Sequence, residues 1–507
     1  MNVFNLSTSF TPIVLATTML LGGCAIGPDY NEPQTAMADV YLNAVDHDTE
    51  ISMTQTPYWW LQLNDETLNQ LVHDAQKQNI PLKLASERIK MAQSYQDMVE
   101  SFKVPTVNLG AGYFNYQISQ NDPLLGTAVS PIGVPVGAQP MLGQSVTIAD
   151  KQQSGGFLGA TIAWEVDLFG RIDKQTNAAQ IRKTQAEIYQ SGLNTLITAD
   201  VIHNYLQYRG AQERTQLALD NIADQRETLN LVEKMVSSGY GSELDLAQAE
   251  AMLAATESVI PQLDIAKQVH KHRLAILLGE PLTKVDIRLS GEGGLPKVEG
   301  IIPIGLPSDL LTRRPDIRIA EREMAAINQE LGVSIANRYP KFFLTGSPGL
   351  VAGDFSDLFS SDSFSWVGSA GISWNVFDGG RGEAMVDINE SRFKSAALRY
   401  QHTVDGAFAE VDSMLFTYGR SQENQRRIDE ANRSTDNAVM KAKSLYRAGL
   451  INHLAVLDAQ RQQKLMQDRQ IAAKLQTAQV TVGLYKALGG DWDLTSRSGS
   501  GSGEASQ

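Results

Sequence analysis

The sequence predicts a mixed α+β fold, mostly α, in which one unit of helices and strands occurs twice. Three observations support this fold class: a segment that recurs 210 residues later, long segments without proline, and short Gly-rich runs of alternating hydropathy. At about 150 residues per domain, 507 residues would suggest three or four domains. Two copies of one unit explain the pattern better than four unrelated domains.

The duplication follows two constant offsets. The stretch Trp164–Arg171 recurs as Trp374–Arg381, and the offset of 210 holds to the end of both copies without a gap. Upstream, Val104-Pro105 matches Tyr339-Pro340 at an offset of 235. The difference of 25 residues therefore lies between Pro105 and Trp164, where residues 123–149 are loop-like and rich in Gly and Pro. A period this long argues against a solenoid.

The N-terminal residues have the pattern of a targeting segment. Residues 1–23 carry no charged side chain, and the apolar run Pro12–Leu21 is too short to span a membrane but fits a signal-peptide core. The run ends at Gly22-Gly23-Cys24, which resembles a bacterial lipobox, so we expect several acyl chains on Cys24 to anchor the chain firmly. An ordinary signal peptide with an incidental cysteine is the alternative.

Each copy is expected to begin with a helix, at 66–101 and 308–337, followed by two strand-like runs around a loop. In the run 155–169, Phe157, Thr161 and Glu165 share one face, while Leu158, Ile162 and neighbours share the other. One apolar and one small or polar face suits a wall between lipid and water, although half of a soluble β-sandwich would alternate in the same way. The four runs are 104–119, 155–169, 341–351 and 364–377.

Two very long helices then follow in each copy. No proline occurs from Met141 to Ile260 or after Pro348, so Arg171–Val236 could form one helix of roughly 100 Å. Such a helix cannot fit inside one globular core and predicts a coiled coil or a helical tube. Glycines at 239 and 449 would turn the chain into return helices at 243–278 and 452–488. In the second copy a heptad seam with small central members favours closely packed helices; it comprises Ile428, Ala431, Thr435, Ala438, Ala442 and Leu445.

Four strands per chain cannot close a barrel, and open sheet edges do not survive in lipid. If these strands lie in a membrane, several chains must share one barrel. Three chains would supply 12 strands and 12 long helices.

Composition excludes several classes of function. Lys and Arg number 43 against 57 Asp and Glu, and this net charge of −14 opposes nucleic-acid binding. A single cysteine excludes a disulfide framework and Cys-rich metal sites. His270-Lys271-His272 resembles a metal pair, but residues i and i+2 diverge on a helix, so solvated surface is the expected environment. We find no catalytic constellation, and we expect neither an enzyme nor a cofactor beyond the lipid on Cys24.

The combination resembles the TolC-like outer membrane factors, specifically their lipoprotein (NodT/OprM-like) branch in resistance–nodulation–division efflux systems. The most specific match is Leu306–Ile317 with its Arg313-Arg314-Pro315-Asp316 core. Further matches are Cys24–Tyr30, Trp59-Trp60 with Leu68 and Leu71, and the junction Trp374–Arg381. The resemblance implies a homotrimer with a shared 12-stranded transmembrane β-barrel, a periplasmic α-barrel and an equatorial belt. It also implies outer-membrane localisation, which Ala25 after the cysteine supports because the inner-membrane retention Asp is absent.

On this basis we expect six segments. They are a lipoprotein signal peptide (1–23), a lipidated and equatorial N-terminal segment (24–65), a first repeat (66–280), an equatorial linker (281–307), a second repeat (308–490) and a flexible tail (491–507).

The resemblance also places a periplasmic gate just after the second helical hairpin, at Tyr446, Leu454, Asp458 and Arg461. Leu454, Asp458 and Arg461 are spaced four and three residues apart, so they share one helix face. In a trimer they would form a Leu ring and an Asp ring with Arg available for ion pairs. The first copy has Gln248 and Ala251 in place of Asp458 and Arg461. An ordinary intrahelical ion pair is the alternative.

The expected function is a passive outer-membrane exit duct, driven by an inner-membrane pump through a periplasmic adaptor that packs its helical hairpins between those of the duct. A structural coiled-coil envelope lipoprotein without a channel would explain the long helices but not the duplicated strands. The adaptor itself would have one helical hairpin and additional domains that this chain lacks.

Overall fold

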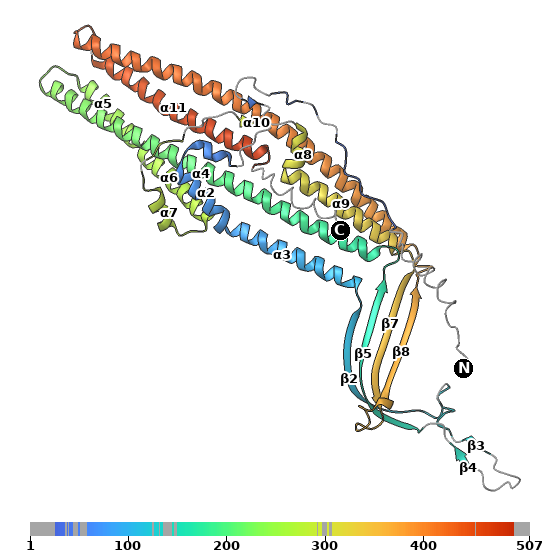
Figure 1. Cartoon of the computed structure of the whole chain (residues 1–507). Coiled ribbons are helices and arrows are strands. Elements are labelled where there is room, and N and C mark those ends of the chain that lie inside the picture. The colour runs from blue at the N-terminus through green and yellow to red at the C-terminus, as the bar shows by residue number, and fades with distance from the viewer. Residues whose placement is uncertain are drawn as a thin grey trace, which may run out of the picture. The chain divides into compact units, whose positions relative to one another are not determined.

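A computed structural model describes residues 26–35, 38, 40–43, 49–50, 58–123, 126–130, 132–134, 144–146, 150–291, 293–296, 302–303, 307–451 and 453–490. The proposed lipidation residue Cys24, the signal peptide and the tail 491–507 lie outside the described residues. The chain divides into two compact units. One comprises 1–30, 93–180 and 325–393, and the other comprises 31–92, 181–324 and 394–507. Figure 1 shows the elements in chain order.

The first unit contains the four-stranded sheet. Its strands β2 (Thr106–Gln117), β5 (Gln152–Val166), β7 (Lys341–Ala352) and β8 (Phe364–Ser373) lie in the order β2-β5-β7-β8, and all neighbours are antiparallel. The four expected runs are therefore all strands and form one sheet (Figure 1). Short pairs join β3 (Ile132–Val134) to β4 (Gln144–Val146) and, in the second unit, β1 (Thr49–Glu50) to β6 (Ile302–Pro303).

Register gives the sheet one apolar face. Leu158 of β5 lies opposite Leu350 of β7, which in turn lies opposite Phe364 of β8. The other face is mostly small or polar, and there Thr345 and Ser369 share a hydrogen bond of 2.7 Å, although Phe114, Phe157 and Phe343 also lie on it. The apolar face comprises Val107, Leu109, Ala111, Tyr113, Leu158, Ala160, Ile162, Trp164, Phe342, Leu344, Leu350, Phe364, Trp366 and Ile372. Such alternation suits a wall between lipid and water.

Proline residues divide the shorter helices that precede the strands. The helix expected at 66–101 is two helices, α2 (Glu66–Gln78) and α3 (Ile80–Glu100), followed by η2 (Ser101–Lys103). Pro81 cannot donate a backbone hydrogen bond, and the Asn79 side chain instead accepts from the Leu82 amide at 3.2 Å. In the second copy η3 (Pro307–Asp309) and α8 (Leu310–Arg313) precede α9 (Pro315–Ala336), which begins at a proline.

The long helices confirm the duplication. α4 (Arg171–Ser237) and α10 (Arg381–Arg447) each have 67 residues, about 100 Å, and their bounds differ by the offset of 210. The return helix of the first copy is two helices, α5 (Glu243–Glu257) and α6 (Val259–Leu278), because Pro261 prevents a continuous hydrogen-bond ladder. That of the second copy is one helix, α11 (His453–Ala487). Among the described residues, no helix is both long and apolar enough to cross a membrane.

Several shorter elements were not predicted. α7 (Leu282–Leu289) follows α6, η1 (Trp59–Leu63) precedes α2, and η4 (Ser361–Ser363) precedes β8. The predicted seam of α10 is only half-buried at Ile428, Ala431, Thr435 and Ala442, and it is exposed at Ala438 and Leu445. Val439 is the buried position of this segment. A helix that packs against neighbours on two sides buries residues on more than one of its faces, so a single heptad seam does not describe its buried positions.

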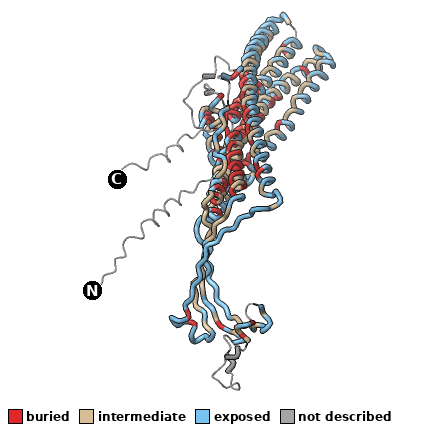
Figure 2. The backbone as a smooth tube through the Cα atoms, turned by 90° about the vertical axis from the view of Figure 1, so that its right-hand side faces the viewer, coloured by how far each residue is buried: buried red, intermediate tan, exposed pale blue. Residues whose placement is uncertain are grey.

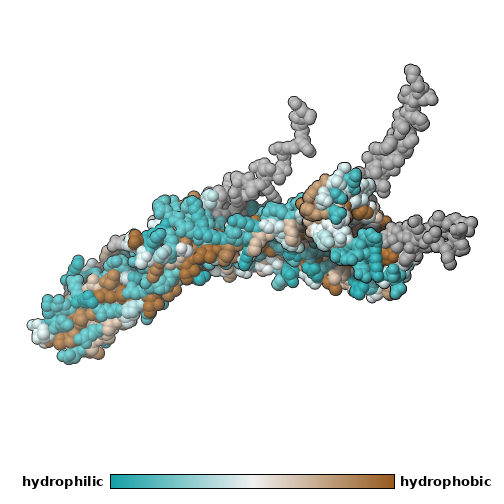
Figure 3. All heavy atoms as spheres, turned by 90° about the horizontal axis from the view of Figure 1, so that it is seen from below, coloured by the Kyte–Doolittle hydropathy of each residue, from teal (hydrophilic) through white to brown (hydrophobic). Residues whose placement is uncertain are grey.

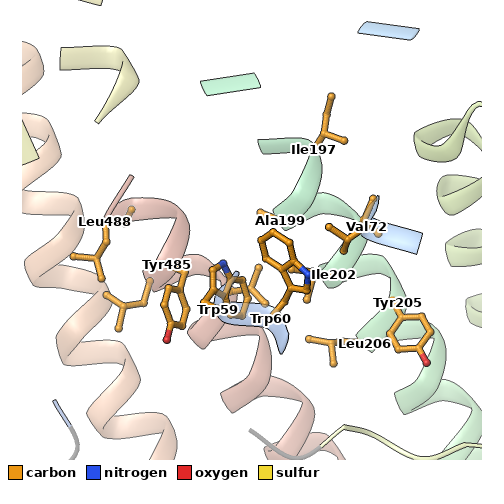
Figure 4. Close-up of a cluster of buried hydrophobic side chains, with 14 of the residues drawn as sticks. Trp59, Trp60, Val72, Ile197, Ala199, Ile202, Tyr205, Leu206, Tyr485 and Leu488 are labelled. Atoms are coloured by element: carbon orange, nitrogen blue, oxygen red, sulfur yellow. The ribbon is translucent and has the colours of Figure 1, made fainter. Parts of the chain in front are cut away.

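The second unit contains the main hydrophobic core. Trp59 stacks on Tyr485 with ring centroids 4.2 Å apart, and Trp60, Ile202 and Leu206 lie beside them (Figure 4). Burial, together with a smaller effect of the nearby Tyr418, raises the pKa of Tyr485 to about 12. Buried residues concentrate within the helices and are sparse on the strands (Figure 2). On the face shown in Figure 3, exposed apolar residues break the polar surface of the helices in separate stretches.

Candidate functional site

The expected gate residues lie at the hairpin that joins α10 to α11. Gly449 adopts a positive φ of 70°, its amide bonds the Tyr446 carbonyl at 2.9 Å, and the Leu450 amide bonds the Leu445 carbonyl at 2.9 Å. This is a helix C-terminus closed by a left-handed residue. Tyr446 therefore lies in the last turn of α10, and Leu454 lies in the first turn of α11.

Three of the expected residues share one face of α11. Arg461 Nη2 donates to Asp458 Oδ1 at 2.6 Å, and both side chains are about 60% exposed. Leu454, one turn earlier, is 50% exposed, and Tyr446 is 37% exposed. An exposed ion pair three residues apart stabilises a helix by only about 0.2–0.5 kcal/mol. The pair therefore adds little to the stability of the isolated chain.

The first-copy hairpin has the same turn but different side chains. Gly239 has a φ of 77°, and the Tyr240 amide bonds the Met235 carbonyl at 2.8 Å. α5 begins with a capping box, in which Ser242 and Asp245 exchange side chain–backbone hydrogen bonds. Leu244, the counterpart of Leu454, is 65% exposed. An equivalent of the Asp458–Arg461 pair cannot form, because Gln248 and Ala251 occupy those positions.

A shallow groove lies beside the expected gate residues, between α4, α5 and α11. Arg461 lines this groove as well as pairing with Asp458. Ion pairs tie α4 to α11 along it: Lys464 with Asp224 at 3.3 Å and, further along, Arg214 with Asp468 in a bidentate arrangement at 2.7 and 3.1 Å. Sequence reasoning missed these pairs because their members are about 240 or more residues apart and no local pattern links them.

A tryptophan at the end of a strand in each copy makes the same hydrogen bond. Trp164 Nε1 donates to the Lys103 carbonyl at 3.0 Å, and Trp374 Nε1 donates to the Arg338 carbonyl at 2.9 Å. Both acceptors stand two residues before a proline, as the 235-residue offset requires. The two bonds fasten the strand-to-helix junction to the turn before the preceding strand. The recurrence of the two tryptophans in the sequence was the signal from which this repeated hydrogen bond could have been predicted.

The Arg-Arg-Pro-Asp motif builds a buried staple in the second unit. The Arg314 guanidinium donates to both carboxylate oxygens of Asp316 at 3.0 and 2.7 Å and to the Ala487 carbonyl at 2.7 Å. It also pairs with Glu410 at 2.8 Å. Burial lowers the pKa of Arg314, but the hydrogen bonds and charges of Asp316 and Glu410 more than offset this effect, so the pKa lies above its usual value. This one side chain joins α9, α10 and the end of α11.

The histidines do not form a metal centre within the part of the chain that the structure describes, where no group of three metal-ligating side chains occurs. The expectation of a solvated environment holds for His272, which is exposed, and is wrong for His270. His270 Nδ1 lies 3.0 Å from Asn204 Oδ1 of α4. Burial lowers the pKa of His270, and the nearby His203 lowers it further. Helix packing, which the local sequence does not specify, brings these residues together.

Comparison with known proteins assigns the chain to a class. Residues 71–280 and 306–490 match the family described as "Outer membrane efflux protein". The chain is 29% identical to outer membrane protein OprJ of Pseudomonas aeruginosa, with 96% of each protein covered. It is 28% identical to the toluene efflux pump outer membrane protein TtgI of Pseudomonas putida, with 96% of this chain and 99% of TtgI covered.

Solved structures give the same result. The outer-membrane channel OprN superposes with a TM-score of 0.80 at 32% identity, covering 92% of this chain and 99% of OprN. The CmeC channel of Campylobacter jejuni has the same fold, with a TM-score of 0.80 at 21% identity and coverage of 93% and 96%. The chain therefore belongs to the outer membrane efflux protein family.

Family membership defines the role of the fold. The protein is an outer-membrane channel of a tripartite efflux system, and it functions as a trimer with a periplasmic adaptor and an inner-membrane pump. It resides in the outer membrane with a large periplasmic helical part. The family consists of channel-forming proteins rather than enzymes. The alternative of a coiled-coil lipoprotein without a channel is wrong.

Proposed function

We propose that the duct is gated at its periplasmic end by Tyr446, Leu454, Asp458 and Arg461. The observation that carries this proposal is the exposed face of α11, where an apolar side chain, a carboxylate and a guanidinium follow one another directly after the hairpin turn. The Asp458–Arg461 pair contributes little to the stability of one chain, so its value would lie in contacts between chains. The first copy lacks the charged pair, as expected if only one hairpin per chain carries the gate.

In a closed trimer, three Asp458 carboxylates would approach one another and repel. Neighbouring Arg461 guanidinium groups would offset this repulsion and hold the closed state. A ring of three Leu454 side chains would exclude water, while the carboxylate ring would attract cations. The gate would therefore combine an apolar constriction with an electrostatic lock.

Planar-bilayer recordings of the purified trimer test the gate. Arg461→Ala should raise the open probability, Asp458→Asn should lower the cation preference of the current, and Leu454→Ser should raise leak. Arg427→Ala serves as a matched control, because Arg427 pairs with Glu430 three residues later on α10 and is 66% exposed. Unchanged conductance and selectivity in all three gate variants would place the constriction elsewhere.

We also propose that Cys24 carries the lipid anchor. The support is its lipobox-like context and its identity as the only cysteine of the chain. Cys24→Ser should abolish labelling by a radioactive or clickable fatty acid. An unmodified mature N-terminus at another residue in the wild-type protein would refute the anchor. Loss of efflux is not required, because the proposal concerns the attachment of lipid to Cys24 and the labelling measures that attachment directly.

We further propose that the duct is permissive and that the pump selects the cargo. The names of relatives at similar identity refer to different cargo: TtgI to toluene at 28% and CusC of Escherichia coli to cations at 25%. Exchanging the cognate pump and adaptor while keeping this duct should therefore change the resistance profile. A profile that instead follows the duct would contradict permissiveness.

A further inference from the structure

Among the strands that the structure describes, none pairs with either outer edge of the four-stranded sheet. β2 and β8 are its outer strands, and both are largely exposed. Unpaired backbone N–H and C=O groups are costly in a membrane, so each edge must pair with another strand there. In a threefold-symmetric trimer whose sheets close into one barrel, β8 of each chain must pair with β2 of the next, because β2 and β8 are the two outer strands. The internal duplication specifies which residues face each other across that joint.

The two copies of the β-hairpin have identical registers. Thr106 pairs with Ala163 in the first copy, and Lys341 pairs with Ser373 in the second. These pairs are related by the sequence offsets, 235 for the first strand of each hairpin and 210 for the second. β2 and β7 also correspond residue for residue, as 106–117 and 341–352. The offsets are therefore reliable guides to equivalent backbone positions.

The chain also contains one joint between copies, where β5 pairs with β7. There Val166 lies opposite Phe342, Trp164 opposite Leu344, and Ile162 opposite Gly346. Applying the offsets to this joint converts β5 into β8 and β7 into β2 of a neighbouring chain. We propose that the trimer closes with Val376 opposite Val107, Trp374 opposite Leu109, Ile372 opposite Ala111 and Ala370 opposite Tyr113 of the next chain.

Side-chain faces support this register independently. Leu109, Ala111 and Tyr113 lie on the apolar face of the sheet, and so do Ala370 and Ile372. The proposed pairs keep apolar residues opposite apolar residues, whereas a slip by one position would place the apolar set on the polar face. A register shifted by two residues would also keep apolar residues on the apolar face. The pairing of β5 with β7 inside the chain is therefore what distinguishes the proposed register from the shifted ones.

The length of the strands points to the same joint. β5 pairs with β2 as far as Ala163, and only its partner β7 extends it to Val166. β8 pairs with β7 as far as Ser373 and ends there in the single chain. Pairing with the next chain would extend β8 by the same three residues, to Val376. Trp374 and Val376 are 55% and 77% exposed, whereas Trp164 and Val166 are half-buried at the internal joint.

The junctions beyond the strands differ in one respect. Phe169 packs on Tyr339 and Phe342 within the chain, with ring centroids 5.1 and 6.4 Å apart. Its second-copy counterpart is Gly379, and the neighbouring Phe377 is 91% exposed. The inter-chain junction therefore has a different aromatic contact, while the strand register depends on backbone pairing.

Disulfide trapping tests the register, because the chain has only one other cysteine and acylation of Cys24 would remove that thiol. Ile372→Cys is combined in turn with Leu109→Cys, Ala111→Cys and Tyr113→Cys, and membranes are oxidised with copper phenanthroline. Directly opposed residues have Cα atoms about 4.5–5.5 Å apart, within the disulfide range, whereas residues shifted by two are about 7–8 Å apart. The pair with Ala111 should give covalent trimers in several-fold excess over the other two.

A second set of cysteine pairs keeps the register testable if one of the first variants does not assemble. Ala370→Cys should cross-link to Tyr113→Cys in preference to Ala111→Cys or Asn115→Cys. Mass measurement in detergent under reducing conditions establishes that each variant is a trimer before oxidation. Dominant cross-linking of a shifted pair, or no cross-linking of the proposed pairs in assembled trimers, would overturn the register.

Discussion

Removing the guanidinium of Arg314 should loosen the C-terminal end of α11. This side chain is 9% exposed and is the point at which α9, α10 and α11 are joined. It makes a bidentate pair with Asp316 and caps the Ala487 carbonyl, where a cation also interacts favourably with the helix dipole. We consider Arg314→Ala, which removes all of these contacts, and Arg314→Lys, which keeps only the charge.

The structure sets the size of the effect. Breaking a buried ion pair by removing one partner costs about 3–5 kcal/mol. Asp316 and Glu410 are 48% and 44% exposed, so water can solvate their carboxylates after the substitution. We therefore expect a smaller cost for Arg314→Ala, about 2–3 kcal/mol, which is typical of lost hydrogen bonds to charged groups. Lysine cannot reproduce the planar fork, and we expect Arg314→Lys to cost about 1 kcal/mol.

Hydrogen exchange of the backbone amides in the last turn of α11 measures this local stability. At 1.36 kcal/mol per factor of ten, Arg314→Ala should accelerate exchange there by about 30- to 150-fold, and Arg314→Lys by about fivefold. Arg427→Ala is the control, because it removes an exposed ion pair on α10 and should change exchange by less than about threefold. Exchange within threefold of wild type in Arg314→Ala would show that the staple does not hold this helix end. Equal rates for Arg314→Lys and wild type would refute the need for a planar fork.

Three further predictions concern the two units separately. Gly27→Ala should release residues 26–30 from α9, because Gly27 has a φ of 126° and the added Cβ would lie 2.9 Å from the Cα of Gly332. Limited proteolysis should cleave this segment faster in Gly27→Ala than in the control variant Asp29→Ala. Trp164→Phe and Trp374→Phe should each cost about 1 kcal/mol and lower the dissociation temperature of the detergent-solubilised trimer by similar amounts, since each loses one equivalent hydrogen bond. The pKa of His270 is lowered by burial and by His203, so the stability that it contributes is present above pH of about 6.5 and is lost as the pH falls. The thermal midpoint should therefore fall more between pH 7 and pH 5 in wild type than in His270→Asn.

The sequence predicted the fold because its signals were repeated or periodic. The offset of 210 from Trp164 to Trp374 reproduces the bounds of α4 and α10, and Gly239 and Gly449 close both hairpins as expected. The sequence prediction was wrong for two helices that were expected to be continuous. Pro81 and Pro261 each divide one of them. Proline removes a backbone donor, and the apolar periodicity on either side conceals the break.

The family resemblance located the candidate gate, and spacing alone predicted that three of its residues share one helix face. Residues 454, 458 and 461 follow the helical repeat, and the ion pair between Asp458 and Arg461 needs no distant partner. The ion pairs beside the gate could not be predicted, because Arg214 and Asp468 belong to different copies and nothing in either local sequence identifies the other helix as its neighbour. The environment of His270 was misjudged for the same reason.

Local sequence patterns were sufficient to predict the duplicated unit, the alternating strands and the hairpin turns. These features follow from backbone preferences and from hydropathy periods that act within a few residues. Long-range packing instead brings Arg314 to the end of α11, stacks Trp59 on Tyr485, and lets the backbone amide of Ile26 bond the Phe169 carbonyl at 3.2 Å. Such contacts join residues more than a hundred positions apart, and their partners are chosen by how complementary surfaces pack, which no local pattern encodes.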